Sequence, residues 1–139
     1  MTAPLAPAII TDIALYCDDE FGRPMAFIAT FHYDDLDPYA VGITFHIPDG
    51  EVPWVVARSL LRCGLTEPAG DGDIRLWPAL DENGCAIVWM TFHSPEGRLR
   101  VAVRSGELLS FLTRTWELVP VGAEPHQFDL DELVAALLA

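Results

Sequence analysis

The stretch that decides the fold is Thr44-Phe45-His46-Ile47-Pro48-Asp49-Gly50, because a close copy, Thr91-Phe92-His93-Ser94-Pro95-Glu96-Gly97, follows 47 positions later. Each copy has proline at the second position of a turn and glycine at the fourth, which is typical of a type I turn. After one gap the likeness continues, since Ala57-Arg58-Ser59 resembles Val103-Arg104-Ser105 and a leucine-rich segment follows each. The pair predicts a duplicated strand-turn-strand-helix unit. The alternative is two hairpins made alike by turn chemistry.

Outside these copies, alternation of apolar and polar residues predicts the other strands. The expected strands are residues 8–17, 23–33, 39–47, 52–57, 73–77, 85–93 and 98–104, with Pro78 ending the fifth. Helices are expected over 59–63, from Ser105 as a cap to about Glu117, and from Asp129 to Leu137.

These elements predict a single α+β domain over residues 1–139, with an antiparallel sheet of seven or eight strands and two or three helices. With 51% apolar residues, the chain has enough hydrophobic surface for a core and for an interface between copies. Residues 1–7 are expected to fray. Residues 66–72, which include Pro68, Gly70 and Gly72, are expected to connect the two halves.

The charge restricts the partners. Eight arginines, no lysine and 21 acids give a net charge of −13, which makes nucleic acid an unfavourable partner because binding it requires cations to neutralise phosphates. No apolar run approaches the length of a membrane span. Three widely spaced cysteines and a start without a basic stretch indicate a cytoplasmic protein, with neither a disulfide framework nor a signal peptide.

Residues that could carry catalysis do not form a recognisable pattern. The sequence has no nucleophile elbow, no His-Glu-x-x-His and no paired Cys-x-x-Cys motif. His46 and His93 fall at matching strand ends, so a proton-transfer or metal site between them is one hypothesis, and ordinary strand-end residues are the simpler one. We therefore expect no catalytic residue, no metal and no cofactor.

One basic stripe stands out. Arg98, Arg100 and Arg104 share a face of the expected strand 98–104, where they could dock an acidic partner segment or pair with this chain's own acids. The four tryptophans, at positions 54, 77, 89 and 116, are flanked mostly by apolar residues and are expected in the core. Base stacking on them would require a cationic groove, and the sequence offers none.

Several motifs together resemble the SsgA-like sporulation and cell-division proteins of actinobacteria. They are Asp37-Pro38-Tyr39-Ala40-Val41, Thr44-Phe45-His46, Trp54-Val55-Val56-Ala57-Arg58 with Leu60-Leu61, Pro68 through Pro78, Ser94-Pro95-Glu96-Gly97, Phe111-Leu112-Thr113-Arg114-Thr115 and Phe128-Asp129-Leu130-Asp131. They run in the family's order from about residue 30 to residue 133.

The resemblance implies a non-enzymatic protein that controls where septa form, in the cytoplasm at division septa. Implied partners are further copies of the chain in a trimer, other SsgA-like proteins and the tubulin-like ring protein FtsZ. The implied fold is a bent, barrel-like antiparallel sheet similar to that of the Whirly proteins, so a single-stranded nucleic-acid-binding module is the alternative function. Candidate partner contacts are Tyr39, Trp77, Arg98, Arg100 and Arg104, whereas Arg58 and Arg114 are expected in structural ion pairs.

Overall fold

The computed structural model describes residues 7–18, 21–124 and 137–138. Its elements are β1 (Ala8–Asp18), β2 (Pro24–Asp34), β3 (Ala40–Ile47), β4 (Gly50–Ala57), α1 (Arg58–Gly64), β5 (Ala69–Asp71), β6 (Ile74–Leu80), β7 (Ala86–Ser94), β8 (Gly97–Arg104) and α2 (Ser105–Leu118). The strands form one antiparallel sheet in the order β4-β3-β2-β1-β8-β7-β6-β5, so the predicted α+β class is confirmed.

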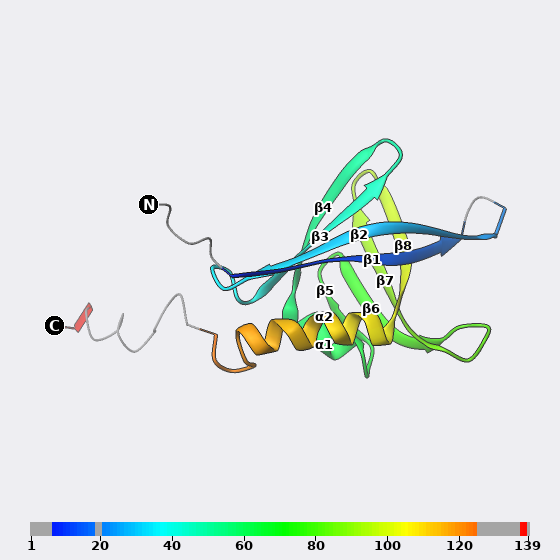
Figure 1. The fold of residues 1–139 in the computed structure, drawn as a ribbon. Helices are drawn as coiled ribbons and strands as arrows, with labels where there is room; N and C mark the ends of the chain where they lie inside the picture. The colour runs from blue at the N-terminus through cyan, green and yellow to red at the C-terminus, as the bar shows by residue number, and fades with distance from the viewer. Residues whose placement is uncertain (1–6, 19–20, 125–136, 139) are drawn as a thin grey trace, which may run out of the picture.

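The sheet is a curled half-barrel whose concave side is closed by the helices. Four consecutive strands lie on each side of the junction between β1 and β8, where Tyr16 and Ala102 are the paired residues. Figure 1 shows α2 running along the long β1–β2 hairpin, with α1 beside it. The predicted helix 59–63 and the predicted helix after Ser105 are thus confirmed, each directly after a hairpin.

The core lies between the concave face and the helices. Alternate strand residues are buried there, and α2 adds Leu108, Phe111 and Leu112 from one stripe, as its helical spacing predicts. The centre of the Phe92 ring lies 5.1 Å from the ring centre of Phe45 and 5.1 Å from that of Trp54, so β7 contacts β3 and β4 across the curl of the sheet. These aromatic contacts join the two ends of the sheet without hydrogen bonds between them.

The prediction that Pro78 ends its strand is wrong. Strand β6 continues to Leu80, with Pro78 opposite Val88 of β7. The backbone N–H of His93 donates to the Asp73 carbonyl over 2.9 Å. Backbone N–H and C=O groups alternate along a strand, so those of odd-numbered residues of β6 point toward β7 and those of even-numbered residues point away from it. Because β5 pairs only with residues 74–76, position 78 points to an open edge where no N–H is required.

Other expectations need smaller corrections. Segment 66–72, expected as a connection, contains the short strand β5. Ser105 is the first residue of α2 rather than its cap: Arg104 occupies the cap position, with no side-chain cap bond. None of the four tryptophans is fully buried; Trp54 and Trp116 pack against the core from its margin. The helix expected from Asp129 lies almost wholly outside the described residues.

Gly64 allows α1 to approach β6 closely. A Cβ added at this position would lie 2.7 Å from Cβ of Leu76, a buried residue. We expect Gly64→Ala to lower the free energy of unfolding by about 1–3 kcal/mol, because overpacking outweighs the better helix propensity of alanine. Urea denaturation measures it. Gly106→Ala in α2 is the matched control, since nothing lies within 4 Å of its added Cβ, and an equal loss in both variants would contradict the account.

Candidate functional site

The convex face of the sheet carries a row of residues over four strands, and three of the four residues are aromatic. The registers place Tyr16 of β1 opposite Ala102 of β8, Ala102 opposite Trp89 of β7, and Trp89 opposite Trp77 of β6. Cross-strand neighbours of this kind touch through their side chains. Ala102 is only 4% exposed, because its larger neighbours cover it.

Arginines flank this aromatic row. Arg100 of β8 lies with its guanidinium carbon 4.2 Å from the ring centre of Trp89 and 5.7 Å from that of Trp77. Such cation–π contacts hold the cation at the surface without removing its charge. Trp77 and Arg100, both predicted as partner contacts, are therefore brought together, and Trp89, which the sequence placed in the core, joins them.

Arg98 and Arg104 continue the same side of β8. Arg98 is exposed opposite His93 of β7, and Arg104 lies with its guanidinium carbon 5.7 Å from the Tyr16 ring centre. A hydrogen bond with Tyr16 raises the pKa of Arg104 further. We call this surface the arginine–aromatic face and define it by Tyr16, Arg75, Trp77, Trp89, Arg98, Arg100 and Arg104.

Sequence reasoning missed Tyr16, Trp89 and Arg75 as members of this face, and Arg75 is the only arginine among them. It precedes Trp77 by two positions on β6, so both side chains project from the same side of the strand. The registers place it in one row with Thr91 and Arg100. The spacing of two from Trp77 was a signal that could have revealed it.

The arginines at 75, 98 and 100 form no ion pair with any carboxylate among the described residues. Of the basic stripe, Arg98 and Arg100 thus show no pairing with this chain's own acids in that part of the chain, whereas the Glu107 charge contributes to the raised pKa of Arg104. In a protein of net charge −13, the arginines at 75, 98 and 100 are exposed cations available to an external anion.

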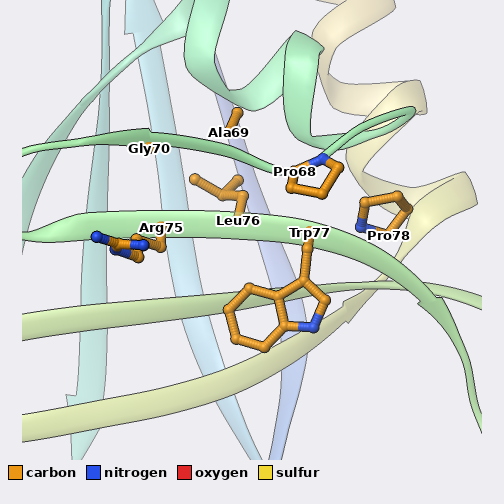
Figure 2. Close-up of a pocket in the computed structure, with 7 residues that line it drawn as sticks. All are labelled: Pro68, Ala69, Gly70, Arg75, Leu76, Trp77 and Pro78. Atoms are coloured by element: carbon orange, nitrogen blue, oxygen red, sulfur yellow. The ribbon is translucent and has the colours of Figure 1, made fainter.

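A hollow of about 480 Å³ opens beside this face at the edge of the sheet. Its lining residues come from the approach to β5 and from β6: Pro68, Ala69, Gly70, Arg75, Leu76, Trp77 and Pro78. Figure 2 shows the Trp77 indole projecting from β6, with Pro68 and Pro78 close to where it leaves the strand. The predicted contact Trp77 therefore joins the arginine–aromatic face to an open hollow.

Tyr39 lies elsewhere. It precedes β3, and its hydroxyl donates to the Glu124 carbonyl over 3.4 Å. Beside it, Arg58 is only 3% exposed and donates to the carbonyls of Thr115 (3.2 Å) and Val119 (2.7 Å) and to Oε1 of Glu124 (2.6 Å). Arg58 thus has the predicted structural ion pair, and Tyr39 adjoins that cluster rather than the arginine–aromatic face.

Two further contacts complete the Arg58 cluster. The Arg58 guanidinium carbon lies 4.9 Å from the ring centre of Tyr33, whose hydroxyl donates to the Pro38 carbonyl over 3.0 Å. Burial raises the pKa of the Tyr33 phenol, although the nearby Arg58 charge acts in the opposite direction. Arg114, also expected in an ion pair, instead donates to Oγ1 of Thr11 over 2.9 Å.

The Arg58 cluster predicts a pH dependence. The Glu124 carboxylate accepts hydrogen bonds from its own backbone, from the Arg58 side chain and from the Gly122 backbone. These bonds lower the pKa of Glu124 from its ordinary value of 4.5. A lowered pKa stabilises the fold above the unfolded-state value, and this contribution disappears as pH falls through the folded-state value. We expect Glu124→Gln to cost about 1–3 kcal/mol at pH 7 and progressively less below pH of about 4.5.

Denaturant unfolding of both proteins at pH 7 and at pH 3.5 measures this difference. Glu117→Gln is the control, because Glu117 is exposed and forms no ion pair with a described residue. If Glu124→Gln lowers the free energy of unfolding by the same amount at both pH values, the carboxylate charge does not contribute to stability.

His46 and His93 do not converge. The registers place them on the convex side, because their neighbours Phe45 and Phe92 point into the core. His46 lies with Nε2 2.7 Å from Oγ1 of Thr30 and Nδ1 3.3 Å from Glu51 Oε1. His93 contacts the Asp73 carbonyl, with Nδ1 3.4 Å from it. The hypothesis of one site shared by both histidines is therefore wrong.

Comparison with known proteins agrees with this architecture. The family described as Streptomyces sporulation and cell division protein, SsgA, matches residues 27–124. The chain belongs to the SsgA family. The match covers β3 through α2 completely, including the arginines of β8 and the hollow beside β5.

Several relatives carry the name sporulation-specific cell division protein SsgB. The chain is 45% identical to SsgB of Streptomyces coelicolor, with 80% of this chain and 81% of that protein covered. It is 39% identical to SsgB of Frankia casuarinae, with 94% and 92% covered. The family resemblance drawn from the sequence motifs is therefore confirmed.

Solved structures of SsgA family members share the fold. An SsgA-like sporulation-specific cell division protein from Thermobifida fusca has a TM-score of 0.80 at 32% identity, covering 97% of this chain and 98% of that chain. A structure from work on SsgB mutations that correlate to longitudinal cell division during sporulation of Streptomyces coelicolor has a TM-score of 0.81 at 35% identity, covering 88% and 97%. Within its described residues, the present protein has no helix of the length and apolarity needed to cross a membrane.

Proposed function

We propose that this protein is a non-enzymatic regulator of sporulation-specific cell division that works as a protein-interaction scaffold in septum-site selection. The observation that carries the proposal is its relation to sporulation-specific cell division proteins in sequence and in fold over most of its length. The family's description names division and sporulation and no reaction. We accordingly propose no cofactor and no catalytic residue.

The proposed partners are FtsZ or other SsgA-like proteins, met in the cytoplasm at division septa. The proposed contacts are Trp77, Arg98, Arg100 and Arg104 on the arginine–aromatic face, together with Tyr39 at its separate position. Support comes from the exposure of Arg98 and Arg100 and from the lack of ion pairs between them and any described carboxylate.

We further propose that the protein assembles as a trimer through apolar residues on the convex side of β1, β2 and β4. Ile10, Ile28 and Val55 are exposed there at 59%, 44% and 69%, and exposed apolar side chains on one face of a sheet are typical of an interface. Light scattering should give a mass close to three times 15.3 kDa. A monomeric mass at micromolar concentration would contradict the proposed trimer.

The duplicated origin of the two halves and the likeness to Whirly proteins also remain proposals. The sheet supports duplication, since β3–β4–α1 and β7–β8–α2 follow the same order on opposite sides of the junction. Both matching hairpins turn at a glycine with positive φ, 138° at Gly50 and 150° at Gly97, which explains the shared glycine.

The scaffold role is tested by pull-down of purified SsgA-like proteins with the full chain and by imaging a fluorescent fusion in sporulating cells. Specific retention of a family member and accumulation at septa are expected. A chain that retains none of them and stays diffuse would contradict the proposal.

Single-stranded nucleic-acid binding is the second candidate, because Arg100 contacts two tryptophans on an exposed face. The Arg100 guanidinium covers the Trp89 ring that a base would need, and the net charge of −13 opposes phosphates. Titration of a labelled oligonucleotide at low salt decides between the two candidates, since tight, salt-sensitive binding would favour the nucleic-acid function.

A further inference from the structure

The hollow beside Trp77 lies where the sheet edge is open but cannot accept a full strand. Strand β5 pairs with β6 only at residues 74–76, so the edge of β6 beyond Leu76 has no partner strand among the described residues. Position 78 faces that edge, and proline there has no N–H to offer. Addition of a partner strand is therefore disfavoured, because it depends on main-chain hydrogen bonds.

The walls of the hollow suit an apolar or proline side chain. Pro68, Trp77 and Pro78 line it, and Gly70 lies opposite Arg75 without a side chain to fill the space. A Cβ added at Gly70 would lie 3.4 Å from Cγ of Arg75, so a larger residue at this position would occupy the hollow. Aromatic and proline walls of this kind bind extended, proline-containing segments.

The strand positions of Arg75 and Arg100 have the spacing that such a segment requires. Arg75 and Arg100 occupy one row with Thr91 between them, so their strands lie two spacings, or roughly 10 Å, apart. In a polyproline II segment, residues three apart share a side and lie about 9 Å apart. Two carboxylates three residues apart would therefore reach both arginines, neither of which has a described carboxylate partner.

We propose that the hollow beside Trp77, together with Arg75 and Arg100, binds an acidic extended segment of a partner protein, with a proline or other apolar residue as its anchor. This inference rests on the proposed scaffold function and adds the chemistry of the partner. Charge complementarity favours a carboxylate-bearing segment, since Arg75 and Arg100 are exposed cations at this surface and have no ion pair with a described carboxylate. Phosphates of a nucleic acid would meet the same cations, and they form a separate arm of the test.

The test uses the full chain and two labelled nine-residue peptides, followed by fluorescence anisotropy. One peptide carries glutamates three positions apart around a proline, and the other has glutamine at the same positions. We expect the glutamate peptide to bind about tenfold tighter at low salt, the size of effect given by a charge-assisted hydrogen bond, and to weaken as salt rises. Equal affinities, or no binding at millimolar peptide, would overturn the proposal.

Three variants, each checked for folding by circular dichroism, locate the site. Arg75→Ala with Arg100→Ala should weaken the glutamate peptide about tenfold or more, whereas Arg62→Ala on α1 should leave it unchanged. The original chain should bind the glutamate peptide more tightly than the same peptide with glycine in place of the proline. Gly70→Val should remove this difference in affinity while keeping the preference for glutamate over glutamine. An unchanged affinity in the double variant, or tighter binding of a labelled oligonucleotide than of the peptide, would overturn the site.

The proposed scaffold function and the proposed peptide-binding surface can be contradicted independently of each other. If the double variant still retains SsgA-like proteins and FtsZ as the original chain does, the scaffold role stands and this surface is wrong. If the glutamate peptide binds at this surface while no division protein is retained, the site stands and the scaffold role is wrong.

Discussion

Replacing Arg58 by methionine is expected to lower the free energy of unfolding by about 3–5 kcal/mol, the usual cost of removing one partner from a buried ion pair. The substitution leaves the Glu124 carboxylate without its cation and removes the Arg58 donor from the Val119 and Thr115 carbonyls, of which Thr115 keeps the Val119 N–H. Methionine retains most of the volume, so the loss reports polar contacts rather than a cavity. Urea denaturation at pH 7 measures it.

Arg62→Met is the matched control, because Arg62 is exposed on the same helix and the effect should stay within about 0.5 kcal/mol. Adding Glu124→Met to Arg58→Met should restore part of the loss, since no unpaired charge then remains. A cost below about 1 kcal/mol for Arg58→Met would show that the cluster does not hold α1 against α2.

Phe92→Ala is expected to destabilise the fold by a similar amount, about 3–5 kcal/mol. The ring is 1% exposed and contacts Phe45 and Trp54, which belong to the opposite end of the sheet. Its removal leaves a cavity where the curled sheet closes on itself. The expected result is a lower denaturation midpoint in urea, with an intermediate loss for Phe92→Leu.

Phe21→Ala is the control, since Phe21 is 73% exposed and its truncation should cost less than about 1 kcal/mol. If Phe92→Ala does not accumulate in folded form, Phe92→Leu still gives the comparison. Equal costs at positions 92 and 21 would mean that the contacts across the curl do not stabilise the protein.

Strand positions were predictable because each strand has a buried face and an exposed face. Arg98, Arg100 and Arg104 were predicted to share one face of β8, and the buried residues Val101 and Val103 lie on its other face. The end of β6 was not predictable, because proline is acceptable there only at an edge that β5 leaves open. Local sequence does not contain that information.

The candidate face was predictable only in part. Trp77 and Arg100 were identified separately, but their contact depends on the registers of β6, β7 and β8, which no local pattern specifies. Arg58 was predicted to be structural from its motif. Its partner Glu124 lies 66 residues away, too far for sequence spacing to connect the two.

The central claim, that this protein binds division proteins through an exposed cationic surface, is tested most directly by co-sedimentation with polymerising FtsZ. The full chain is expected to pellet with FtsZ polymers. The Arg98→Ala, Arg100→Ala, Arg104→Ala triple variant, which leaves the Arg58 cluster untouched, is expected to remain largely in the supernatant. A chain that stays in the supernatant at every FtsZ concentration, or a triple variant that pellets as the original does, would contradict it.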